Sequence, residues 1–175
     1  QSRSSAASDV YKRQTMGQAA PEVGDLAPDF TLQGSDGNAY SLSDFRDKAY
    51  VVIAFFPKAF TGGEDRMQGL RDSDKEIQNF EVAYFMASTD NPQDNAGFAA
   101  KNGATFPILS DPEKQMTADY GVLSGGGSAK RWTFYINKKG IIQRIDKAVR
   151  PRTAGKTLVS SLRELNVPMR AVQKN

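Results

Sequence analysis

The sequence of 175 residues contains neither cysteine nor histidine. Without cysteine the chain can form no disulfide and offers no thiol nucleophile, and without histidine it lacks the side chain that normally titrates near neutral pH. Zinc sites built from cysteine and histidine are excluded for the same reason. We therefore expect no metal site and no cofactor.

Long apolar runs and a large net charge are also missing. No apolar run approaches the roughly 20 residues needed to cross a bilayer. The formal net charge of +3 is too small to indicate nucleic-acid binding without a concentrated basic patch. We expect a soluble protein with no nucleic-acid or membrane partner. Because structural disulfides are absent, cysteine usage leaves the compartment open between the cytoplasm and export with a lost signal peptide.

The basic excess is uneven along the chain. From Arg144 onward, eight lysines and arginines stand against only Asp146 and Glu164. Two interpretations remain open at this point: a surface for an acidic partner, or a solvated face, which is the more common meaning of such a run.

The composition changes at both ends of the chain. Residues 1–14 (QSRSSAASDVYKRQ) are polar, show no periodicity and resemble translated adapter sequence, so they are left out of the fold. Residues 15–23 are expected to be a linker and residues 167–175 a C-terminal tail. The remaining residues, 24–166, fit one domain, since a chain of this size buries roughly 70% of its surface in a single core.

The domain is expected to centre on a strand, a loop and a helix that follow one another directly. Tyr50–Phe56 (YVVIAFF) has no polar residue to mark a solvent face, which is typical of a strand buried on both sides. Pro57 ends this strand, and Gly62 and Gly63 allow a tight turn. Residue 64 then falls in the first turn of the helix, where unpaired amides and the helix dipole favour an anion.

The helix itself is predicted from its apolar spacing. Met67, Leu70 and Ile77 recur at helical spacing. The charged residues Arg66, Arg71, Asp72 and Asp74 are interpreted as lying off that apolar stripe.

The other elements complete an α/β fold. Val82–Ala87 is a second buried strand that forms a βαβ unit with the first, and a helix follows it with Asn91 or Asp90 as its cap. Further strands and helices are predicted at Thr31–Leu32, Phe106–Ser110, Arg131–Ile136, Ile141–Ile145 and Thr153–Leu165. We expect a mixed central sheet with helices on both faces.

Three segments resemble one known family. Asp25–Phe30 is similar to the entry segment of thioredoxin-like proteins, and Pro57 with Thr61 resembles the Pro-x-x-x-Thr-x-x-Cys signature of the peroxiredoxins, the alkyl hydroperoxide reductase and thiol-specific antioxidant (AhpC/TSA) family. Arg131 opens the run RWTFYINKKG, which resembles the family's arginine-bearing strand. The resemblance extends from about residue 24 to residue 165 and implies a thioredoxin-like fold.

The resemblance also implies a site in which the essential residue is replaced. In the family, the arginine and the helix N-terminus stabilise a peroxidatic thiolate, while the threonine and the proline shape its pocket. The matching positions are Pro57, Thr61 and Arg131, but Glu64 stands where the cysteine belongs. A carboxylate attacks peroxide poorly and has no return route by thiol exchange. No intact catalytic residue is therefore expected.

Two functions from different classes follow. The first is a family member without peroxidase activity that acts by binding. It would form a homo-oligomer or a hetero-oligomer with active relatives, or it would bind a small anion in the pocket around Glu64 when the Glu64 side chain leaves that pocket. The alternative is an antioxidant oxidoreductase that lends Arg131 and the pocket to an external thiol.

Two further interpretations concern Glu64. Hydrolysis by Glu64 and Asp65 is disfavoured, because neighbouring residues on a helix point about 100° apart. Glu64 also has a purely structural interpretation, as an acidic residue that complements the helix dipole.

Overall fold

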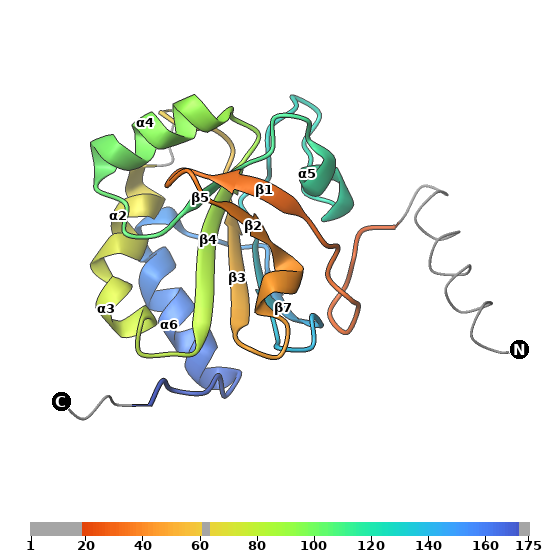
Figure 1. Cartoon of the computed structure of the whole chain (residues 1–175), viewed down its shortest axis with the longest axis vertical. Helices are drawn as coiled ribbons and strands as arrows, with labels where there is room; N and C mark the ends of the chain where they lie inside the picture. Colours follow the sequence, from red (N-terminus) through yellow and green to blue (C-terminus); the bar gives the residue numbers. More distant parts are fainter. Residues whose placement is uncertain (1–18, 61–63, 172–175) are drawn as a thin grey trace, which may run out of the picture.

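The computed structural model describes residues 19–60 and 64–171, and these form a mixed sheet of seven strands (Figure 1). The strand order is β2-β1-β5-β4-β3-β6-β7. Strands β3, β4 and β5 are mutually parallel, whereas β1, β2, β6 and β7 join the sheet by antiparallel pairing. The bounds are β1 Thr31–Gly34, β2 Ala39–Ser41, β3 Tyr50–Phe55, β4 Val82–Ser88, β5 Ile108–Ser110, β6 Thr133–Ile136 and β7 Ile142–Asp146.

Strand β3 lies in the interior of the sheet, as predicted. It pairs in parallel with β4 on one side and antiparallel with β6 on the other. Its side chains alternate between two apolar cores: Val52 and Ala54 face one core, and Val51 and Ile53 face the other. Both sets are almost fully buried. The unbroken apolar run therefore reflects two covered faces.

Helices cover both faces of the sheet, but unevenly. One face packs against α2 (Glu64–Asp72), α3 (Asp74–Ile77), α4 (Pro92–Asn102) and α6 (Ala154–Glu164). The other face is covered by the short helix α5 (Gln115–Asp119), the 3-10 turn η1 (Leu42–Phe45) and the segment before β1. A second 3-10 turn, η2 (Pro151–Thr153), leads into α6.

Local capping signals placed α4 correctly. The side chain of Asn91 accepts a hydrogen bond from the backbone N–H of Asp94 at 2.8 Å, and Pro92 occupies the first turn. Gly103 ends the helix in the left-handed conformation, with a φ of 62° that glycine adopts without steric cost.

Helices α2 and α6 approach each other closely at two glycines. A Cβ atom added to Gly155 would lie 2.1 Å from the backbone oxygen of Gly69. No side chain larger than hydrogen fits there without a shift of the backbone. This contact sets the separation between the start of α6 and the C-terminal half of α2.

The β1–β2 hairpin closes through a turn at residues 35–38. Asp36 accepts hydrogen bonds from the backbone N–H of Asn38 and from the Tyr40 hydroxyl. Partial burial by itself raises the pKa of Asp36, but these hydrogen bonds outweigh it and lower the pKa below its usual value.

The segment after α6 packs against the domain. Val167 is buried, Met169 forms an isolated bridge with Phe80, and the Arg170 guanidinium donates to the Phe80 carbonyl at 2.8 Å. Part of the segment expected to be a C-terminal tail is thus attached to the edge of the fold. The N-terminal residues 1–14 lie outside the described residues.

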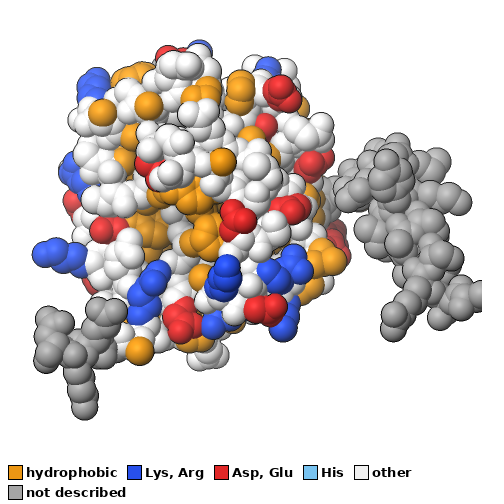
Figure 2. All heavy atoms as spheres, viewed as in Figure 1, with side chains coloured by type: hydrophobic (Ala, Val, Ile, Leu, Met, Phe, Trp, Pro, Cys, Tyr) orange, Lys and Arg blue, Asp and Glu red, His pale blue; other side chains and the backbone are white. Residues whose placement is uncertain are grey.

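Charges of both signs are interspersed on the surface that carries the β1–β2 hairpin (Figure 2). Several residues of the basic C-terminal part form ion pairs with acidic residues, among them Arg144 with Glu164 and Arg163 with Glu76. Within residues 19–60 and 64–171, no helix is long and apolar enough to cross a membrane.

Candidate functional site

The chain topology brings three of the four predicted site positions to one edge of the sheet. Pro57 follows the C-terminal end of β3, and Glu64 is the first residue of α2. Arg131 precedes β6, which runs antiparallel to β3, and the backbone N–H of Phe55 donates to the Trp132 carbonyl at 3.0 Å. The start of β6 therefore lies beside the end of β3.

The three side chains are half-buried. Neither Glu64 nor Arg131 is without an interaction partner. The fourth position, Thr61, lies outside the described residues, as do Gly62 and Gly63.

The loop after β3 is attached to the neighbouring strand by a polar network. The backbone N–H of Ala59 donates to Oδ2 of Asp90 at 2.8 Å, and the Ser88 hydroxyl donates to the same oxygen at 2.8 Å. Asn95, which is fully buried in α4, donates to the hydroxyls of Ser88 and Ser110. The polar end of β4 thus positions the loop that follows β3.

Phe60 occupies the same loop in a left-handed conformation, with a φ of 62°. Its ring contacts Phe98 edge to face, with 5.3 Å between the centroids, and the ammonium group of Lys101 lies 5.5 Å from its centroid. Few non-glycine residues adopt this φ, and those that do are held by their surroundings. The packing on α4 holds Phe60 here.

Arg66 was wrongly interpreted as lying off the buried stripe of the helix. Its side chain is only 1% exposed. Its guanidinium donates from Nη1 to the Phe55 carbonyl and from Nη2 to the Thr133 hydroxyl. Arg66 therefore connects the first turn of α2 to the end of β3 and the start of β6, the three elements that carry the predicted site.

The spacing of the helix contained a signal for this burial. Arg66 precedes Leu70 by four residues, Ser73 by seven and Ile77 by eleven, and all of these are buried. Residues at those separations share one face of a helix. Arg66 was nevertheless not assigned to the buried face of the helix, because arginine is rarely fully buried.

The electrostatics of the site favour negative charge. Burial lowers the pKa of Arg66 to about 10, with the positive charge of Arg131 as a smaller cause in the same direction. Arg66 is therefore protonated at neutral pH, and a second cation lies near it. The N-terminus of α2 adds the positive end of its helix dipole, which favours a negative charge at the first turn. Glu64 supplies a carboxylate at the start of that turn.

The neighbouring carboxylate, that of Asp65, forms an ion pair outside the predicted site. It pairs with the guanidinium of Arg152 at 3.2 Å, and both side chains are largely exposed. Across residues 19–60 and 64–171, no group of three or more acidic side chains is placed to hold a metal ion.

Comparison with known proteins shows one family. The sequence model that describes the AhpC/TSA family matches residues 23–145 of this chain. Alkyl hydroperoxide reductase E of Mycobacterium tuberculosis is 37% identical over 125 residues, which cover 69% of this chain and 82% of that protein. The putative peroxiredoxin bcp of Haemophilus influenzae is 34% identical over 154 residues, covering 82% of this chain and 97% of that protein.

Comparison with solved structures finds the same kind of protein. The crystal structure of peroxidoxin BcpB from Mycobacterium tuberculosis superposes with a TM-score of 0.75 at 27% identity. The match covers 82% of this chain and 97% of that one.

Proposed function

The chain belongs to the AhpC/TSA family, and because it contains no cysteine we propose that it is a member without thiol peroxidase activity that acts by binding. The observation that carries this proposal is Glu64, the first residue of α2, at the position where the family signature has its peroxidatic cysteine.

The chemistry of the carboxylate supports the loss of activity. A peroxidatic cysteine attacks one peroxide oxygen as a thiolate, becomes a sulfenic acid, and returns through a disulfide. A carboxylate cannot follow this route, since no thiol exchange regenerates it. Glu64 instead places a carboxylate where the family has an ionised sulfur. We infer that the Glu64 carboxylate takes the place of the thiolate as the negative group at the N-terminus of α2.

The partner that we propose is a second copy of this chain or a cysteine-bearing relative. A protein that keeps the family fold over most of its length presents surfaces similar to those of its relatives, which favours association with them. Light scattering on the chain alone, and after mixing with a cysteine-bearing relative, measures this directly. A single monomeric species in both samples would contradict it.

A second candidate is a peroxidase that uses an external thiol. It is favoured by the retained arrangement, in which Pro57, Glu64 and Arg131 still lie at one sheet edge. In this reaction two thiols are oxidised to a disulfide, while the hydroperoxide is reduced to an alcohol and water. The cationic surroundings would ionise a thiol bound beside Arg131.

A peroxide consumption assay with dithiothreitol or thioredoxin as reductant separates the two candidates. We expect no consumption above that of the heat-denatured protein. Turnover that scales with protein concentration would overturn the binding-only proposal and support the external-thiol reaction.

The substitution Glu64→Cys tests whether the pocket remains competent. The α2 N-terminus contributes about 0.3–1 kcal/mol to an anion, which lowers a thiol pKa by about 0.2–0.7 of a unit before any effect of Arg131. The new thiol should react with iodoacetamide at mildly acidic pH faster than that of Gln68→Cys. Gln68 is an exposed residue of the same helix beyond its first turn, where the dipole effect has fallen off. Equal rates would show that the pocket no longer stabilises an anion.

A further inference from the structure

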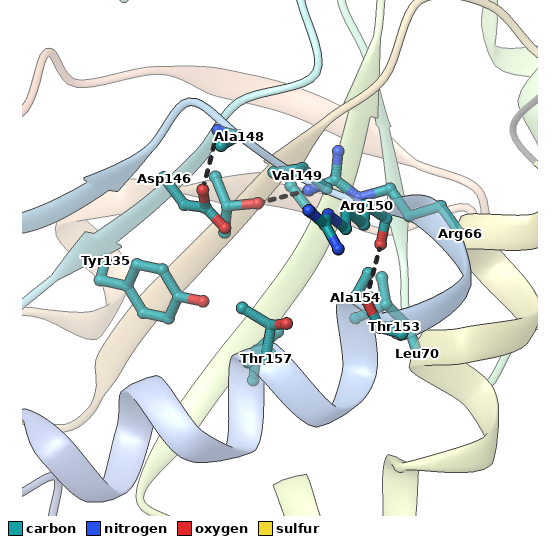
Figure 3. A pocket seen from close by; sticks show the side chains of 13 residues that line it. Arg66, Leu70, Tyr135, Asp146, Ala148, Val149, Arg150, Thr153, Ala154 and Thr157 are labelled. Atoms are coloured by element: carbon teal, nitrogen blue, oxygen red, sulfur yellow. Dashed lines mark hydrogen bonds between the residues drawn. The ribbon is translucent and has the colours of Figure 1, made fainter.

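A cavity of about 240 Å³ lies between α2, α6 and the sheet. Its polar lining residues are Arg66, Thr133, Tyr135, Asp146, Arg150, Thr153 and Thr157 (Figure 3). The side chains come from α2, β6, β7, α6 and the connection before α6. Pro57, Glu64 and Arg131 do not line this cavity. Arg66 lines it and also connects the elements that carry the site described above.

The cavity contains a buried donor with no acceptor. Within the described part of the chain, Nε of Arg66 is buried and has no hydrogen-bond partner, although the two terminal nitrogens are bonded. Arg66 also forms no ion pair among residues 19–60 and 64–171. A buried cation normally has a carboxylate or another anion beside it, because removing the charge from water is costly.

The other groups at the cavity also favour an anion. Arg150 is exposed at its mouth and lies close to Arg66 in Figure 3. Ala154, the first residue of the eleven-residue helix α6, lines the cavity as well, so the positive end of that helix dipole is directed here. The one acidic lining residue, Asp146, accepts a hydrogen bond from the backbone N–H of Ala148 at 2.9 Å, and its negative charge partly offsets the positive charge of Arg66.

The charges of the lining side chains therefore sum to about +1, from two arginines and one aspartate. Tyr135 adds a neutral hydroxyl, because burial raises the pKa of that group above its usual value. The volume suffices for a small anion with accompanying water, since a single water needs only about 10–15 Å³.

We propose that this cavity binds a small oxyanion, a carboxylate or a phosphate, held by the free Nε–H of Arg66 from inside and by Arg150 and the Thr157 hydroxyl at the mouth. Arginine suits both anions, because its N–H groups match the spacing of carboxylate and phosphate oxygens. The site is independent of Glu64 and does not rest on the function proposed above.

Isothermal titration calorimetry with inorganic phosphate and, separately, with acetate tests the proposal, at constant ionic strength set with chloride. We expect saturable binding of one equivalent of at least one of the two anions, and the stronger binder identifies the source class. No saturable binding of either anion would overturn the proposal.

Two neighbouring arginines provide matched variants. Arg150→Gln removes a cation at the cavity mouth and should raise the Kd about three- to tenfold. Arg152→Gln removes an exposed cation that pairs with Asp65 and does not line the cavity, and should change the Kd by less than about twofold. Equal weakening by both variants would show a general surface-charge effect and refute the site.

Arg66→Lys tests the buried donor, because lysine keeps the positive charge and loses the guanidinium Nε. A folded Arg66→Lys protein, verified by circular dichroism, should bind at least about tenfold more weakly. Unchanged affinity in this variant would contradict the role given to Nε. Where the variant does not fold, the comparison of Arg150→Gln with Arg152→Gln decides the question.

Discussion

Replacing Arg66 with methionine tests the connection between α2 and the sheet. Methionine is unbranched and long enough to occupy the same path through the core. The substitution removes the hydrogen bonds to the Phe55 carbonyl and the Thr133 hydroxyl, and it also removes a charge that is costly to bury. The two effects oppose each other, so their magnitudes decide the outcome.

The magnitudes follow from the contacts of the guanidinium. Two hydrogen bonds to a charged donor contribute about 1.5–3 kcal/mol each, or about 3–6 kcal/mol together. Burial is the largest cause that lowers the pKa of Arg66 from 12.5 to about 10, which corresponds to about 3 kcal/mol against the charged form at 1.36 kcal/mol per pKa unit. Arg66→Met should therefore lower the free energy of unfolding by about 0–3 kcal/mol.

Urea unfolding of four proteins isolates the interaction with Thr133: the starting chain, Arg66→Met, Thr133→Val and the double variant. Because the two residues are in direct contact, their effects should be non-additive by about 1–2 kcal/mol. Arg152→Met, which removes an exposed arginine, should change the free energy of unfolding by less than about 1 kcal/mol. Additive effects within about 0.5 kcal/mol, or an Arg66→Met protein more stable by over about 1 kcal/mol, would refute the reasoning.

Two further predictions concern stability away from the site. Gly155→Ala should lower the free energy of unfolding, measured by urea titration, by about 1–3 kcal/mol, because its Cβ would meet the Gly69 oxygen. The control Gly125→Ala has open space around it and should lose less than about 0.5 kcal/mol in the same titration. Equal losses in the two variants would disprove the close contact. Asp36→Asn should lower stability at pH 7 by at most about 1 kcal/mol, because this largely exposed carboxylate is screened by water. The lowered pKa of Asp36 stabilises the fold above the unfolded-state value of about 3.9, and the stabilisation disappears as pH falls through the folded value. Thermal unfolding of both proteins at pH 7 and pH 2 should thus converge at pH 2, and a constant difference would contradict the assignment.

Local patterns alone determined much of the fold. The unbroken apolar run at Tyr50–Phe56 indicated a strand buried on both faces, because only an interior strand tolerates such a run. Of the two caps predicted for the helix after β4, Asn91 is the one found in the structure, and such a cap acts through contacts within one turn of the chain. Predictions of this kind succeed where the physical cause lies within a few residues of its effect.

The replacement at the family's catalytic position was also visible in the sequence. The resemblance of Pro57 and Thr61 to the family signature predicts Glu64 at that position, and a chain without cysteine cannot supply a thiol from elsewhere. The loss of the thiol needs no structure to establish, because it is a matter of covalent chemistry.

The tertiary structure alone decided the role of Arg66 and the existence of the cavity beside it. The partners of Arg66 are Phe55, eleven residues earlier, and Thr133, 67 residues later, and no local pattern brings such segments together. Arg150 at the cavity mouth belonged to a basic segment that resembled a solvated face. Its position beside a buried guanidinium depends on how α6 packs against α2, where the glycines at 69 and 155 allow the two helices to touch. A buried charge and a cavity are both produced by packing between segments that are distant in the sequence. The sequence therefore shows which residues are present but not which of them lie close together in the fold.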